Sequence, residues 1–79
     1  MEKTELLKIV YNKIVELNDK IAIDNLNEDT VILSTGLDSL DYAHIMLTLE
    51  EESNITPDEN TINWADIKTI NQLVTLFLK

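Results

Sequence analysis

The chain has 79 residues, which suffices for one domain spanning 1–79. It carries 6 Lys+Arg and 15 Asp+Glu, which gives a net charge of −9. This negative charge excludes nucleic-acid binding through a basic face and disfavours an anionic membrane surface. With no cysteine, one histidine and one glycine, disulfides, multi-histidine zinc sites and glycine-rich phosphate loops are excluded. Because no long apolar run follows the charged start, we expect neither a signal peptide nor a membrane insertion. We expect a cytoplasmic protein, which the absence of cysteine fits, and a monomer.

The charges are concentrated in the middle of the chain. Residues 21–67 contain no lysine or arginine but include eleven of the aspartates and glutamates. A protein that docks on this middle part is therefore expected to present a basic surface.

Helical periodicity dominates the first segment. Apolar residues recur at helical spacing and predict a helix over residues 3–18, with the stripe Leu6, Val10, Ile14 and Leu17. Residues 19–37 show no sustained period and predict a long ordered loop, a feature that is usually functional in a small domain. A β-strand over Val31–Leu33 is an alternative, for which the sequence offers no obvious partner strand.

The second helix has a clear start signal. Asp38 is a good N-cap and Asp41 stands at the third helical position, which predicts a capping box and a helix from Ser39 to about Ser53.

Two more helices are predicted after it. Thr56 followed by Pro57 predicts a helix of one or two turns, and Thr69 with Gln72 caps a final helix. The core stripe of that final helix is Ile70, Leu73, Val74 and Phe77. The fold class is therefore all-α, a small four-helix bundle of three main helices and a short third one, with a long loop between the first two.

The second helix carries two apolar faces. The face expected to meet the core holds Tyr42, Ile45, Met46 and Leu49. A second stripe of Leu40, Ala43 and Leu47 lies about 130° around the axis. This second stripe is bordered by Ser39, His44, Glu50 and Glu51.

Ser39 stands at the head of the second stripe. As the first residue of its helix, it lies beside free backbone N–H groups and the positive end of the helix dipole, where a phosphodiester is favoured. Gly36 precedes it by three residues and allows a sharp turn.

The runs Gly36–Asp41 (GLDSLD), Leu47–Glu52 (LTLEEE) and Thr56–Glu59 (TPDE) resemble an acyl carrier protein, and the resemblance extends over nearly the whole chain. It implies that Ser39 receives 4′-phosphopantetheine from coenzyme A through a phosphopantetheinyl transferase, with Asp38 and Leu40 as flanking contacts. It implies a non-enzymatic carrier whose arm presents thioester-bound intermediates to acyl- or aminoacyl-processing enzymes with basic patches.

The same resemblance assigns the two faces of the second helix. The residues that match the partner-binding positions are Asp41, Ala43, Leu47, Glu50 and Glu51. Those that match the interior positions where acyl chains are sheltered are Tyr42, Ile45, Met46 and Leu49. The resemblance gives no metal ligands and no catalytic residues.

The chain departs from fatty-acid carriers at several positions. His44 replaces a glutamate, Ser53 an aromatic residue and Thr35 an apolar one. The span from Pro57 to Ile67 is longer than usual and contains Trp64, which is similar to D-alanyl carrier proteins. The cargo is therefore left open between an acyl group of fatty acid or polyketide type and an aminoacyl group.

Three other functions match parts of the sequence. A Gly-Asp-Ser-Leu hydrolase is rejected because Leu37 interrupts the motif and His44 lies about 140° around the helix from Ser39. An EF-hand after Asp58 is rejected because Asn63 and Thr69 occupy the positions of the loop glycine and the bidentate glutamate. An acidic interaction module without a modification remains an alternative.

Overall fold

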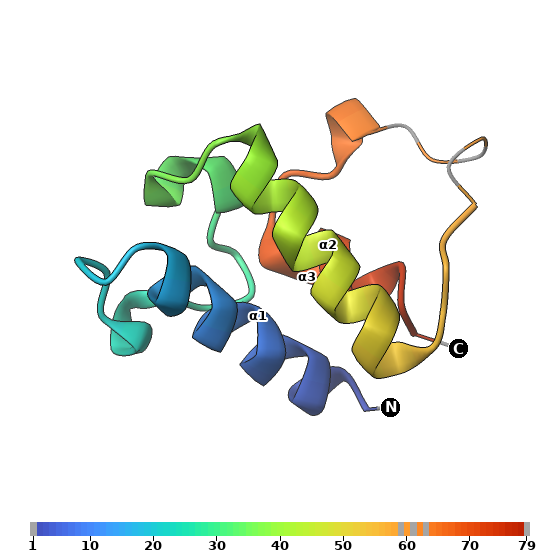
Figure 1. Cartoon of the computed structure of the whole chain (residues 1–79), viewed down its shortest axis with the longest axis horizontal. Helices are drawn as coiled ribbons and strands as arrows, with labels where there is room; N and C mark the ends of the chain where they lie inside the picture. Colours follow the sequence, from blue (N-terminus) through green and yellow to red (C-terminus); the bar gives the residue numbers. More distant parts are fainter. Residues whose placement is uncertain (1, 59, 61, 63, 79) are drawn as a thin grey trace.

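The computed structural model describes residues 2–58, 60, 62 and 64–78. Its helices are α1 (Lys3–Leu17), α2 (Ser39–Ser53) and α3 (Ile70–Thr75), with 3₁₀ turns η1 (Ile23–Asn25), η2 (Ile32–Thr35) and η3 (Trp64–Asp66). The described residues form no sheet, so the predicted all-α class is confirmed. Figure 1 shows α1 and α2 running in opposite directions, with α3 behind α2.

The three helices enclose one hydrophobic core. The predicted apolar stripes supply most of it, because a helix that buries one face keeps its apolar residues at helical spacing. Its fully or almost fully buried members are Leu6, Val10, Ile14, Ile32, Leu37, Ile45, Leu49, Ile70, Leu73, Val74 and Phe77. Two of these, Ile32 and Leu37, come from the connection before α2 and hold that connection against the bundle.

The long connection between α1 and α2 is ordered, as predicted, and contains η1 and η2. The strand alternative at Val31–Leu33 reduces to an isolated antiparallel bridge between Val31 and Thr69. Around it, the Ile32 N–H donates to the Lys68 carbonyl and the Ile70 N–H donates to the Thr30 carbonyl, each at 3.0 Å. These bonds tie the connection to the start of α3, which the sequence pattern did not indicate.

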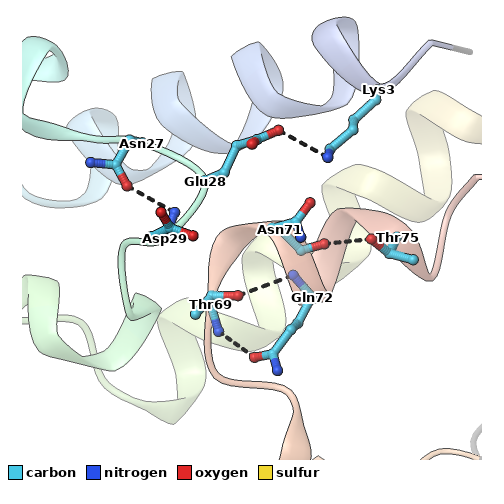
Figure 2. A network of polar contacts seen from close by, with 8 residues as sticks. All are labelled: Lys3, Asn27, Glu28, Asp29, Thr69, Asn71, Gln72 and Thr75. Atoms are coloured by element: carbon cyan, nitrogen blue, oxygen red, sulfur yellow. Dashed lines mark hydrogen bonds and ion pairs between the residues drawn. The ribbon is translucent and has the colours of Figure 1, made fainter.

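The start of α3 lies in a polar network (Figure 2). Thr69 and Gln72 form the predicted capping box, with the Gln72 N–H donating to Thr69 Oγ1 at 3.2 Å and the Thr69 N–H donating to Gln72 Oε1 at 2.9 Å. Beside it, Lys3 Nζ pairs with Glu28 Oε1 at 2.9 Å, so the start of α1 is also held to the loop.

The predicted short helix after Thr56 does not begin at Pro57. Residues 54–58 have no regular structure, and the next helical turn in the described chain is η3. The cause is local: the Asp58 carboxylate accepts the Asn60 N–H at 3.0 Å, which makes a turn where a helix would need that N–H for its own ladder. Glu59, the third residue of the predicted start, lies outside the described residues.

Candidate functional site

The start of α2 is built by two aspartates. Asp38 Oδ1 accepts the Asp41 N–H at 2.9 Å, and Asp41 Oδ2 accepts the Asp38 N–H at 3.4 Å, so the predicted capping box is confirmed. Each carboxylate is therefore turned toward the backbone of the first helical turn. The side chain of Ser39, which stands between them, is left exposed.

The backbone turn that precedes Ser39 is held in place by Gly36 and Asn18. Gly36 has φ 84, in the left-handed region, and a Cβ on it would lie 3.0 Å from Asn18 Nδ2. That same Nδ2 donates to the Thr35 carbonyl at 2.9 Å, which joins the end of α1 to the turn before α2. Asn18 is thus a positioning residue that local sequence patterns could not identify, because its partner lies seventeen residues away.

Gly36→Ala is expected to lower stability. A left-handed conformation costs an L-residue about 1–2 kcal/mol, and the new methyl group would press on the Asn18 amide. The expected fall in melting temperature is about 4–8 °C for each kcal/mol in a domain of this size. Thermal denaturation followed by circular dichroism measures it, and a variant that melts with the parent would contradict the constraint at Gly36.

The surroundings of Ser39 suit a covalently attached anion. Within the described part of the chain, the N–H groups of Ser39 and Leu40 meet no hydrogen-bond acceptor, as is usual for the first turn of a helix. These donors and the helix dipole favour a phosphodiester here. The negative charges of the neighbouring Asp38 and Asp41 repel a phosphodiester, but each of these carboxylates accepts a backbone N–H of the capping box.

The outward face of α2 is apolar within an acidic border. Leu40 is 75% exposed and Leu47 is 55% exposed, and Ala43 between them is also exposed. Of the border residues, Ser39, His44 and Glu51 are exposed and Glu50 is half-buried, as is Asp41 in the first turn. The structure therefore brings together all the residues that the sequence assigned to the outward stripe and its border.

The inward face of α2 joins the core. Ile45 and Leu49 are fully buried, and Tyr42 and Met46 are half-buried and packed against the core. Burial raises the pKa of the Tyr42 hydroxyl above its ordinary value. Among the described residues no pocket opens beside this face.

In the described chain no three His, Cys, Asp or Glu side chains gather as potential metal ligands. None of the described helices is long and apolar enough to cross a membrane.

Comparison with known proteins identifies the family. Residues 13–77 match the family profile described as PP-binding, the phosphopantetheine attachment site. No curated protein and no solved structure matched the chain. The profile covers most of the chain, including α2 with its exposed serine and capping box. The protein therefore belongs to the phosphopantetheine attachment site family and is a non-catalytic carrier that bears a phosphopantetheine group.

Proposed function

We propose that Ser39 is the residue that receives 4′-phosphopantetheine, within a carrier domain formed by the whole chain. The observation that carries this proposal is the exposed Ser39 side chain at the first position of α2, beside N–H groups that have no acceptor in the described chain. When bound, the group supplies a thiol on a flexible arm, which this cysteine-free chain lacks. Asp38 and Leu40, on either side, are proposed as the flanking contacts.

The direct test is the intact mass of the protein. The chain is incubated with coenzyme A and a promiscuous phosphopantetheinyl transferase, and its mass is recorded before and after. A carrier gains one phosphopantetheine. An acidic interaction module without a modification would keep its mass, which would overturn the proposal.

The outward face of α2 is the proposed docking surface for the transferase and for cargo-processing enzymes. It comprises Asp41, Ala43, Leu47, Glu50 and Glu51 together with the exposed Leu40. Its carboxylates attract a basic patch and speed association, while its exposed leucines give the apolar contact. Because exposed charge pairs are screened by salt, binding to each enzyme is expected to be weak and salt-dependent.

Glu51→Lys is expected to slow modification by the transferase by on the order of 10-fold at low salt, because it reverses an exposed charge on the docking surface. Glu51 suits this test better than Asp41, whose carboxylate also belongs to the capping box. The matched control is Glu5→Lys on α1, which changes the net charge equally at an exposed position. Equal rates for both variants, or rates insensitive to salt, would contradict the proposed surface.

For the cargo, we propose thioester-bound intermediates of fatty acid or polyketide type, which the core-facing side of α2 would shelter. The apolar character of Ile45, Met46 and Leu49, together with Tyr42, supports this use. An aminoacyl cargo is the second candidate, favoured by the likeness of the Pro57–Ile67 span with Trp64 to D-alanyl carriers. The mass of the group released from protein purified from its own host distinguishes the two.

A further inference from the structure

The hydroxyl of Tyr42 is buried without a hydrogen-bond partner. Its oxygen is shielded from solvent, and the described chain offers it neither a donor nor an acceptor. A buried polar group in this state is destabilising, since it gives up its bonds to water and receives none in return. The same burial raises the pKa of the hydroxyl, whose ordinary value already leaves it a neutral donor at physiological pH.

The position of Tyr42 relates this hydroxyl to Ser39. Tyr42 follows Ser39 by three residues on α2, which places the two Cα atoms about 4.5 Å apart along the axis and about 60° apart around it. Long side chains on a helix lean back toward its N-terminus, so we expect the Tyr42 side chain to extend toward the turn that carries Ser39. A group tethered to Ser39 that folds inward against α2 therefore meets Tyr42 early on its path.

The other side chains of this inward face give no polar contact. Ile45, Met46 and Leu49 pack against the core and present carbon and sulfur atoms. An alkyl chain entering here would leave the Tyr42 hydroxyl unsatisfied. An oxygen-bearing group would satisfy it, and this difference in hydrogen bonding favours the oxygenated group.

We propose that the Tyr42 hydroxyl is a specificity-determining hydrogen-bond donor for an oxygen atom carried on Ser39, so that the carrier holds oxygenated groups more firmly than plain alkyl chains. The bond runs from the phenol O–H to a carbonyl or hydroxyl oxygen and involves no covalent step. This inference rests on the proposed attachment at Ser39. The oxygen has two sources, an amide carbonyl of the arm itself and an oxygen near the thioester end of the cargo.

The experiment compares four forms of the full chain: unmodified, modified with coenzyme A, modified with butyryl-coenzyme A and modified with 3-hydroxybutyryl-coenzyme A. Each is prepared for the parent, for Tyr42→Phe and for Tyr11→Phe, and melting temperatures are measured. Tyr11, the other tyrosine of the chain, is also half-buried against the core and serves as the matched control.

If the cargo supplies the oxygen, the 3-hydroxybutyryl form should melt about 4–8 °C above the butyryl form, the shift expected for one net hydrogen bond in a domain of this size. If the arm supplies the oxygen, the melting temperature of the coenzyme A-modified form should exceed that of the unmodified form by the same amount. In both cases the gain should disappear in Tyr42→Phe and persist in Tyr11→Phe. A gain that persists in Tyr42→Phe, or no gain in the parent, would overturn the proposal.

Two readouts separate this inference from the proposed function. In the unmodified protein, Tyr42→Phe removes an unsatisfied hydroxyl, so the variant should melt at or above the temperature of the parent. A lower melting temperature would show that the hydroxyl is already hydrogen-bonded and would overturn the inference. Carbon NMR of the parent protein with labelled tyrosine should show a change in chemical shift at Tyr42, and none at Tyr11, when the phosphopantetheine group is attached. If mass spectrometry shows no modification, the attachment at Ser39 fails, whereas modification without these changes refutes the Tyr42 role alone.

Discussion

Replacing Ser39 with alanine is expected to abolish the mass gain on incubation with coenzyme A and a phosphopantetheinyl transferase. The variant lacks the oxygen that would form the phosphodiester, and the nearest hydroxyl on α2, that of Tyr42, is buried. The exposed position of Ser39 means that the domain itself should stay folded, with a change in stability within about 0.5 kcal/mol. Intact-mass measurement and a melting curve on the same sample check both points.

The chain offers a matched control for this substitution. Ser34 is also exposed and lies close in sequence, but its hydroxyl donates to the Val31 carbonyl at 2.7 Å and it stands in η2, before Gly36. Ser34→Ala should therefore gain one phosphopantetheine like the parent. A mass gain in Ser39→Ala, or its loss in Ser34→Ala with the fold intact, would assign the attachment to another residue.

Leu49→Ala is expected to give the largest loss of stability. Leu49 is fully buried on the inward face of α2, and truncating a buried leucine costs about 2–5 kcal/mol through lost burial and the cavity left behind. For a domain of this size the melting temperature should fall by about 10 °C or more. Denaturation by urea or heat, followed by circular dichroism, measures the effect.

Leu47→Ala provides the comparison from the same helix. Leu47 is 55% exposed on the outward face, so its truncation should change stability by no more than about 0.5 kcal/mol. It should instead slow modification by the transferase, since it removes apolar contact from the docking surface. If Leu47→Ala destabilised the domain as strongly as Leu49→Ala, the assignment of the two faces of α2 would be wrong.

The features that were predictable from the sequence depend on neighbouring residues. The caps at Asp38 and Thr69 and the apolar stripes of α1, α2 and α3 are local patterns, and the structure contains them, with Phe77 buried just beyond the end of α3 at Thr75. The two faces of α2 follow from helical spacing alone, and so does the exposure of Leu40 and Leu47.

The features that were missed depend on contacts between distant segments. The bond from Asn18 to the Thr35 carbonyl and the bridge from Val31 to Thr69 join residues that no short pattern relates. The helix predicted to begin at Pro57 was wrong because the Asp58 side chain competes for a backbone N–H within the same turn. The unpartnered Tyr42 hydroxyl likewise becomes visible only when the core is assembled around it.

Locating the modified residue within the chain tests the role of Ser39 most directly. The parent protein is modified with coenzyme A and a transferase, digested and sequenced by tandem mass spectrometry, so that the label is placed among the serines Ser34, Ser39 and Ser53. We expect the whole phosphopantetheine mass on Ser39, the exposed first residue of α2. Label on any other residue, or a chain that takes up none, would contradict the proposed attachment.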